Sequence, residues 1–254
     1  MKGPAAAPPR LSIIVPALNE GATIGALLAD LAPLRAAGAE VILVDGGSTD
    51  DTRERAAGGV DRVLRAPTGR ATQMNAGAEA ARGDLLWFLH ADNRVPMDAA
   101  PALQAAWAGG ARWGRFDVRL SGRHPLLRLV ARAMNLRSRL TGIATGDQGL
   151  FVTRATFGQA GGFPPLALME DIALSAALRR LARPACLRVR LGASSRRWEE
   201  GGVLRTIVLM WRLRLAYALG ADPARLARRY DRARVPRPGE HRRAGARQGA
   251  GRSC

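Results

Sequence analysis

Acidic residues follow three short apolar runs in the first 92 residues of the chain. Glu20, Asp45 and Asp92 each come at, or a few residues after, the end of such a run. In an open α/β sheet, the carboxyl ends of parallel strands meet at one edge, and ligands bind there. Carboxylates at this edge suit a hard divalent cation that is also bound by substrate phosphates. The three acids therefore predict one polar site along one sheet edge.

The second of these acids is followed by a turn of small and polar residues. Gly46 and Gly47 let the backbone approach a ligand closely, and Ser48 with Thr49 is expected to cap the next helix. The alternative is a plain capped turn without a ligand.

The third acid has a histidine two residues before it. Asp92 with His90 can bind Mg²⁺ or Mn²⁺, although a single loop histidine is more often a hydrogen-bonding residue than a ligand. Arg70, Gln73 and Asn75 lie at an expected helix start, where backbone N–H groups and an arginine can receive an anion. A solvated helix start is the alternative there.

These residues must be positioned by alternating strands and helices. Short apolar runs predict strands at 11–16, 41–45, 62–65 and 85–89, and helical periodicity or caps predict helices at 24–34, 50–57, 71–81 and 98–108. The second half predicts a half-exposed strand at 112–120, a helix at 124–140, a turn at 146–149, a strand at 150–152 and a helix from about 169 to 183. Continuous apolar strands separated by helices indicate an α/β fold with a mostly parallel central sheet flanked by helices.

The charge of the chain is strongly positive and uneven. The 254 residues carry a formal net charge of +18, which favours contact with phosphates, nucleic acid or an anionic membrane. We expect a flexible N-terminus over 1–10 and a disordered, arginine-rich tail over 234–254. The two cysteines allow no disulfide framework, and neither a signal peptide nor a transmembrane helix is expected.

The motifs together resemble the family-2 glycosyltransferases of the GT-A fold, from about Leu11 to Trp198. They occur in family order: 13–20 (IIVPALNE), 44–50 (VDGGSTD), 73–77 (QMNAG), 83–84 with 88–92 (FLHAD), and the acid pair 170–171. The combination of FLHAD, GDQG, GGFP, MED and RRW is similar to a bacterial subgroup of arsenosugar-biosynthesis glycosyltransferases.

The resemblance implies an inverting transferase that moves one sugar from a nucleoside-diphosphate donor to a small or lipid-linked hydroxyl acceptor. Asp92 and His90 would hold Mg²⁺ or Mn²⁺, and Asp171, or less favourably Glu170, would be the general base. The nucleotide-sugar side would comprise Pro16, Asn19, Glu20, Asp45, Gly46, Gly47, Ser48, Arg70, Gln73, Asn75, His90 and Ala91. The acceptor side would comprise Gly146, Asp147, Gln148, Arg197 and Trp198.

The chain departs from the family pattern at three places. His90 stands where the first acid of the metal motif is usual, and Asp45-Gly46 stands where many members have two acids. Arg197-Trp198 lacks the preceding glutamine of the processive members, which favours transfer of a single sugar. The alternative for the acid pair at 170–171 is helix N-terminal capping.

The expected organisation is a transferase domain over 11–200, a helical extension over 201–233 and the tail. The segment 203–219 fits either an interfacial helix on an anionic membrane or a helix packed on the enzyme body. A cytoplasmic protein, peripheral at the inner membrane face if that helix binds lipid, is therefore expected.

Two other functions are weighed against this one. A nucleotidyltransferase would carry a basic, glycine-rich loop after its first strand, where this chain has PALNEGAT. A nucleic-acid-binding protein fits the charge, but two Tyr and five Phe are few for base stacking and no sequence-reading motif is present, so no specific nucleic acid is expected.

Overall fold

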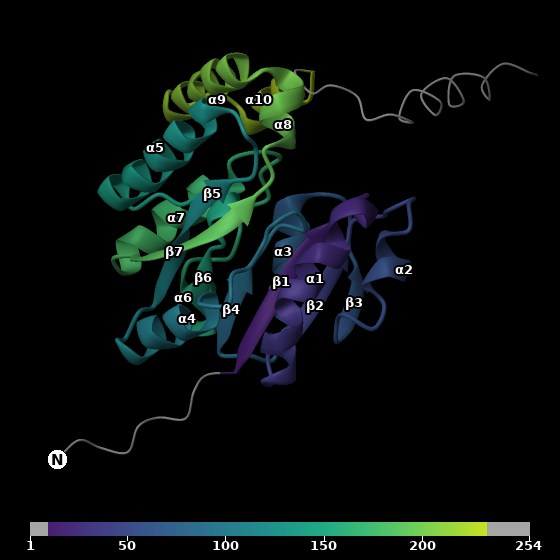
Figure 1. Ribbon diagram of the computed structural model, residues 1–254. Coiled ribbons are helices and arrows are strands. Elements are labelled where there is room, and N and C mark those ends of the chain that lie inside the picture. The colour runs from purple at the N-terminus through teal and green to yellow at the C-terminus, as the bar shows by residue number, and fades with distance from the viewer. Residues whose placement is uncertain (1–9, 233–254) are drawn as a thin grey trace, which may run out of the picture. The chain divides into compact units, whose positions relative to one another are not determined.

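Seven strands form a single sheet in the order β3-β2-β1-β4-β6-β5-β7 in the computed structural model, which describes residues 10–232 (Figure 1). The strands are β1 (Leu11–Ala17), β2 (Glu40–Asp45), β3 (Arg62–Arg65), β4 (Leu85–Phe88), β5 (Trp113–Leu120), β6 (Phe151–Thr153) and β7 (Ala185–Ala193). The predictions of termini over 1–10 and 234–254 fall almost entirely outside the described residues.

Ten helices accompany the sheet within the described residues. They are α1 (Gly21–Ala36), α2 (Thr52–Ala56), α3 (Arg70–Ala80), α4 (Ala99–Ala108), α5 (Pro125–Thr141), α6 (Arg154–Gln159), α7 (Glu170–Leu181), α8 (Arg196–Gly201), α9 (Val203–Ala218) and α10 (Pro223–Arg232), with a 3₁₀ turn, η1 (Gly146–Gln148). The chain divides into two compact units between Ser195 and Arg196, so the sheet belongs to the first unit and α8 to α10 belong to the second.

Most neighbouring strands run parallel, which confirms the predicted fold class. β1 pairs in parallel with β2 and β4, β2 with β3, and β5 with β7, whereas β6 runs antiparallel between β4 and β5. The carboxyl ends of β1, β2 and β4 therefore lie along the same edge. This arrangement brings the three acid-bearing turns of the sequence to one side of the sheet.

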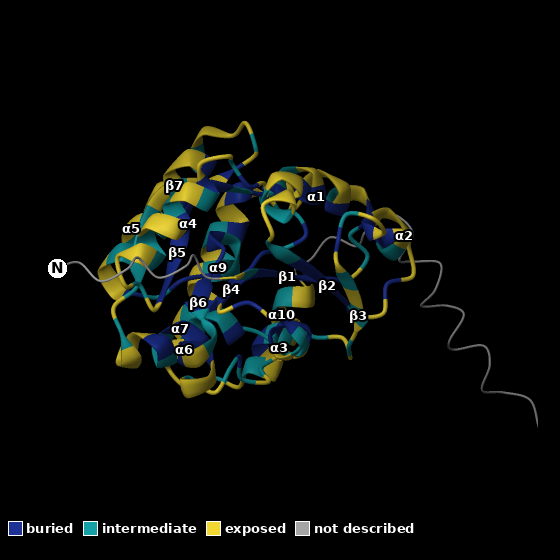
Figure 2. Cartoon of the chain, turned by 90° about the horizontal axis from the view of Figure 1, so that it is seen from below, coloured by how far each residue is buried: buried dark blue, intermediate teal, exposed yellow. Residues whose placement is uncertain are grey.

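Two helical layers cover the sheet because its central strands are apolar on both faces. Ile13 and Val15 of β1 pack in the core with residues of α1 and α4, whereas Ile14 between them packs with residues of α3, α6 and α7. Figure 2 shows the buried strands between these two groups of helices. A Cβ atom on Gly77 of α3 would come 2.4 Å from Ile14 Cγ2, so α3 lies especially close to the sheet.

β5 differs from its prediction as a half-exposed strand, because seven of its eight residues are buried. It lies between β6 and β7 in the sheet, and the Asn135 side chain of α5 bonds both the N–H and the carbonyl of Val118. The charged residues of β5 are accommodated by pairing. Arg115 is fully buried and pairs with Asp117, which also accepts a hydrogen bond of 2.6 Å from Arg139 Nη2.

The second unit begins at Arg196. Its described residues form α8, α9 and α10, and the guanidinium of Arg197 lies 3.3 Å from the ring centroid of Tyr230. Within residues 10–232, every helix is too short or too polar to pass through a bilayer.

Candidate active site

Hydrogen bonds join the turns that follow β1 and β2. The Asn19 N–H donates to Ser48 Oγ (2.9 Å), and the Thr49 N–H donates to Asn19 Oδ1 (2.8 Å). The Glu20 N–H donates to Thr52 Oγ1 (2.8 Å). The prediction that Ser48 and Thr49 cap the next helix is therefore wrong, because α2 begins only at Thr52 and both residues are bonded to the first turn instead. Asn19 has a φ of 55°, a backbone conformation that Asn tolerates better than most residues.

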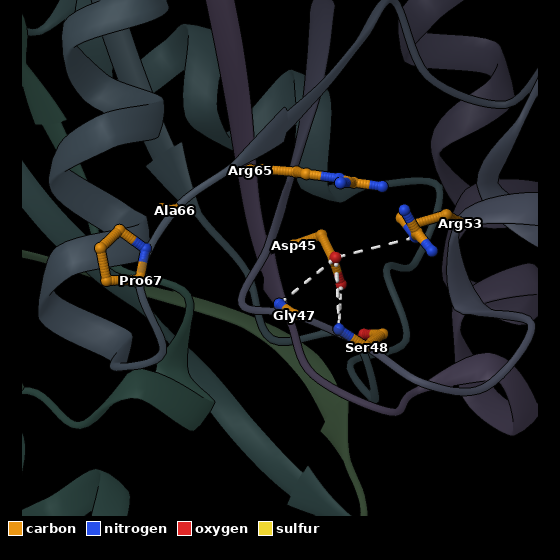
Figure 3. Close-up of a pocket in the computed structure, with 7 residues that line it drawn as sticks. All are labelled: Asp45, Gly47, Ser48, Arg53, Arg65, Ala66 and Pro67. Carbon is orange, nitrogen blue, oxygen red and sulfur yellow. Dashed lines mark hydrogen bonds and ion pairs between the residues drawn. The ribbon is translucent and has the colours of Figure 1, made fainter.

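Asp45 lines a pocket of about 350 Å³ beside the end of β2. Its carboxylate is 1% exposed and accepts hydrogen bonds from the N–H groups of Gly47 (3.3 Å) and Ser48 (3.0 Å). Figure 3 shows Arg53 and Arg65 reaching toward it from neighbouring elements. The pocket thus combines one buried acceptor with two cationic donors.

Neither arginine was among the site residues predicted from the sequence. Arg53 Nε is buried without a hydrogen bond and lies 3.8 Å from Asp45 Oδ2, so it has donor capacity toward the pocket. Arg65 is the last residue of β3, and β3 pairs in parallel with β2. Its position at a parallel strand end was the signal in the sequence that could have identified it.

Two polar residues of α3 bond to the protein backbone. Both N–H bonds of the Gln73 amide go to strand-end carbonyls, Ala17 O (2.9 Å) and Val44 O (2.8 Å), and the side chain is 3% exposed. The Asn75 amide exchanges two hydrogen bonds with the backbone of Phe163. Gln73 therefore fixes the ends of β1 and β2, and Asn75 fixes the GGFP loop.

Gln73 also explains the first glycine of the second turn. A Cβ atom on Gly46 would lie 3.0 Å from the Gln73 carboxamide, so only a glycine fits there without a shift of that side chain.

Two other predicted residues contribute little side-chain chemistry. Pro16 is a buried strand residue, and the Ala91 methyl lies in the core, so neither side chain offers a polar group to a ligand.

The loop after β4 is held by an asparagine that was not among the predicted site residues. Asn93 is 1% exposed, and its Oδ1 accepts from the His90 N–H (2.7 Å) while its Nδ2 donates to Gly192 O (3.2 Å). The imidazole of His90 pairs through Nδ1 with Asp147 Oδ1 at 3.3 Å. Asn93 and Asp147 together fix the position of His90.

The turn at η1 contacts both His90 and Asp171. A Cβ atom on Gly146 would lie 2.4 Å from His90 Nε2, so a glycine is needed for the imidazole to approach. The Gly146 N–H donates to Asp171 Oδ2 (2.8 Å). Gln148, predicted for the acceptor side, is fully buried and closes a capping box with Thr145. The structure therefore joins His90, Asp147 and Asp171 through one turn.

Charges converge around Asp92. Burial raises the pKa of Asp92, and the nearby carboxylates of Asp147 and Glu20 raise it further, against the opposing effects of His90 and Arg70. For His90, burial lowers the pKa, but the hydrogen bond to Asp147 prevails and the pKa is raised. A carboxylate whose charged form is disfavoured in this way would be stabilised by an added cation.

The residues present fit a divalent cation that takes some of its ligands from the protein and the others from a substrate. Within the described part of the chain, no three His, Cys, Asp or Glu side chains gather as a complete metal site. Mg²⁺ commonly uses one or two carboxylates and takes its other ligands from phosphates and water. Asp92, with its unfavourable burial, meets this requirement, whereas the His90 side chain pairs with Asp147.

Glu170 and Asp171 are the first two residues of α7 and follow a residue with a strained backbone. Met169 has a φ of 70°, which a bulky side chain rarely adopts and which is often found at functional sites. Glu170 is 5% exposed, and burial together with Asp171 raises its pKa. Asp171 is half-buried and accepts from the N–H groups of Gly146 and of Ile172 (2.7 Å). Asp171 is thus the more accessible acid and is held in a fixed orientation.

The two remaining acceptor-side residues belong to the second unit. Arg197 and Trp198 lie in α8, where the Arg197 side chain bonds the carbonyl of Tyr230 (3.2 Å). Their assignment to the acceptor side stays a prediction.

Comparison with known proteins shows the family to which the chain belongs. The model of the family described as "Glycosyl transferase family 2" matches residues 12–154, which is more than half of the chain. Glycosyltransferases of PGL/p-HBAD biosynthesis from Mycobacterium tuberculosis and Mycobacterium bovis are 36% identical over 110 residues, covering 41% of this chain and 43% of the relative. The match therefore spans less than half the length of these curated relatives.

Solved structures share the fold. TarS 1–349 of S. aureus is 21% identical, with a TM-score of 0.60, over 73% of this chain and 60% of that one. Glucosyl-3-phosphoglycerate synthase from Mycobacterium tuberculosis, solved with Mn²⁺, UDP and glucosyl-3-phosphoglycerate, is 25% identical, with a TM-score of 0.56, over 73% and 71%. The chain belongs to glycosyl transferase family 2 and has the GT-A fold.

Proposed function

We propose that this family 2 member transfers one sugar from a nucleoside-diphosphate donor to a hydroxyl acceptor, with inversion at the anomeric carbon. The observation that carries the proposal is the shared sheet edge, where the pocket at Asp45 and the charged cluster of Asp92, Asp147 and Asp171 both lie. The mycobacterial synthase of similar fold, solved with UDP and Mn²⁺, supports a nucleotide donor and a divalent cation.

The pocket beside β2 is proposed to hold the nucleoside. The buried carboxylate of Asp45 can accept hydrogen bonds from ribose hydroxyls or from a base N–H group. Arg53 and Arg65 can donate to base carbonyls or to phosphate oxygens at the rim. The polar groups of this small pocket would therefore orient the donor before reaction.

Asp92 is proposed to hold the cation against the diphosphate, with His90 beside it. A divalent cation bound there would neutralise the charge that develops on the leaving diphosphate. Arg70 adds a fixed positive charge, since it acts electrostatically on both His90 and Asp92. The role of Asp147 is to hold His90 in place through the 3.3 Å contact.

Asp171 is proposed as the general base. Its carboxylate takes the proton from the acceptor hydroxyl as that oxygen bonds to the anomeric carbon, and the bond from that carbon to the diphosphate oxygen breaks. A single displacement of this kind inverts the configuration. The hydrogen bond from Gly146 keeps Asp171 oriented, and Glu170, at 5% exposure, is too enclosed to meet the acceptor as readily.

The acceptor is proposed to be a small or lipid-linked alcohol. A place in arsenosugar biosynthesis is supported by the FLHAD, GDQG, GGFP, MED and RRW motifs alone. The expected cytoplasmic location likewise stays a prediction.

Three matched carboxamide variants test the assignment. Asp92→Asn should reduce sugar-donor turnover by about 10²-fold or more, and Asp171→Asn should lower kcat by about 10²- to 10⁴-fold with the donor Kd retained. Asp84→Asn, at an exposed position outside the cluster, is the control and should be neutral. Unchanged turnover in Asp92→Asn would contradict the metal role, and release of pyrophosphate in place of nucleoside diphosphate would indicate nucleotidyl transfer.

A further inference from the structure

One face of α9 is apolar and open to solvent. The exposed fractions are 67% for Leu204, 55% for Val208, 74% for Trp211, 62% for Leu215 and 79% for Leu219 just past the helix end. With about 100° between successive residues, these five positions span only about 80° of the helix circumference. We call this set the α9 stripe. Single exposed apolar residues are ordinary, but a contiguous stripe marks an interaction surface.

Arginines border the α9 stripe. At the same helical pitch, Arg205 and Arg212 lie along one margin and Arg214 along the other, and α9 contains no acidic residue. Residues 196–232 hold nine arginines against four acids. Four of these arginines are exposed on α10, which packs against α9 within the same unit: Arg225, Arg228, Arg229 and Arg232.

We propose that the α9 stripe binds the surface of an anionic lipid bilayer, with α9 lying parallel to the membrane. The leucines, Val208 and Trp211 would enter the boundary between headgroups and acyl chains, and the bordering arginines would contact lipid phosphates. The excess of positive charge around an apolar face favours this occupant over an uncharged protein surface. The proposed position is on the surface and not across the membrane, because α9 is too short and too charged to span the membrane.

This association is independent of the proposed sugar transfer. Binding to vesicles can be measured without donor or acceptor, so failure of either proposal leaves the other standing. If both hold, the reaction takes place at a membrane surface, where a lipid-linked acceptor would be within reach.

Vesicle flotation of the full chain is the first test. Vesicles of phosphatidylglycerol and phosphatidylcholine should carry the protein, whereas pure phosphatidylcholine vesicles should carry at least about tenfold less. Trp211→Ser combined with Leu215→Ser should weaken binding about tenfold or more, because it removes two exposed apolar side chains. The control Met97→Ser removes an even more exposed apolar side chain, at 93%, from the first unit and should bind as the wild type does.

The charged border is tested separately. Arg205→Gln combined with Arg212→Gln should weaken binding to the anionic vesicles, and the control Arg82→Gln, an exposed arginine of the first unit, should not. At 0.5 M salt, contacts made by charge alone are strongly screened. Binding that remains in the wild type at this salt concentration, but is absent from the Trp211→Ser, Leu215→Ser variant, would support apolar insertion.

Tryptophan fluorescence identifies the inserted residue. Trp211 alone among the five tryptophans is exposed, since Trp87 and Trp113 are fully buried and the others are intermediate. Anionic vesicles should shift the emission of the wild type to shorter wavelength, and Trp211→Phe should remove that shift while the protein still floats.

Three results would overturn the proposal. They are the absence of flotation by the wild type, equal flotation by the Trp211→Ser, Leu215→Ser variant, and a wild-type dimer in solution that this variant converts to a monomer. The last result would show that a second copy of the chain, rather than lipid, covers the α9 stripe.

Discussion

A methyl group at position 146 should disturb the turn that joins His90, beside the proposed metal ligand, to Asp171, the proposed base. In Gly146→Ala, the new Cβ atom would lie 2.4 Å from His90 Nε2 and 2.5 Å from its Cε1. An ordinary contact begins near 3.4 Å, so the imidazole or the turn must move by about 1 Å. The imidazole cannot move freely, because Asp147 lies 3.3 Å from Nδ1 and Asn93 holds the backbone N–H.

The expected loss is larger for activity than for stability. A misplacement of about 1 Å in a reacting group can cost about 10²-fold in rate, so we expect kcat/KM to fall by roughly that factor. Overpacking costs about 1–3 kcal/mol, and the lower end is expected because a single methyl group is added. A loss of about 1 kcal/mol in the free energy of unfolding corresponds to a fall in Tm of about 2–4 °C.

The assay is release of nucleoside diphosphate with Tm measured on the same samples. Gly25→Ala is the control, because its Cβ atom would meet nothing within 4 Å on the exposed face of α1. The effects of Gly146→Ala and His90→Ala should also be non-additive. In a His90→Ala background the ring is gone, so adding Gly146→Ala should change kcat/KM by less than about threefold.

Two results would refute this reasoning. One is a single variant Gly146→Ala with kcat/KM within about threefold of the wild type. The other is an undiminished effect of Gly146→Ala in the His90→Ala background, which would mean that the contact with the imidazole is not the cause.

Three further outcomes concern stability. Gly77→Ala should lower the free energy of unfolding by about 1–3 kcal/mol in urea, because its Cβ would come 2.4 Å from Ile14 Cγ2 in the core. Asp117→Ala should cost about 3–5 kcal/mol, because it leaves the fully buried Arg115 without its carboxylate partner. Burial raises the pKa of Asp30, but hydrogen bonds from Arg94 and the Val95 N–H prevail and lower it. Asp30→Asn should therefore be less stable than the wild type near pH 7. That difference should fade as the pH falls below about 4 through the folded-state pKa, which pH-dependent unfolding can measure.

Much of the fold follows from local patterns in the chain. The short apolar runs of β1, β2 and β4 are buried on both faces, and their alternation with helices is what predicted covered, parallel strands. The pattern failed for β5, since Arg115 and Asp117 read as exposed positions and only their pairing with each other and with Arg139 allows burial. A period-two pattern carries no information about which charges will be paired.

The residues of the site also fall into those that the sequence predicts and those that only the structure reveals. The chain itself supplies Asp45, Asp92 and Asp171 after an apolar strand or at a helix start, and family motifs assign them roles. Gln73, by contrast, bonds strand-end carbonyls, and Asn93 donates to the carbonyl of Gly192, which no spacing along the chain predicts.

The sequence by itself thus determines which chemical groups follow which strands, because strand ends and helix starts are local features read from neighbouring residues. Only the tertiary structure decides which of those groups meet. His90 pairs with Asp147, 57 positions later, and Gly146 bonds Asp171, 25 positions later. These contacts depend on the order of strands in the sheet and on a glycine where an imidazole needs space, and neither is encoded in any short segment.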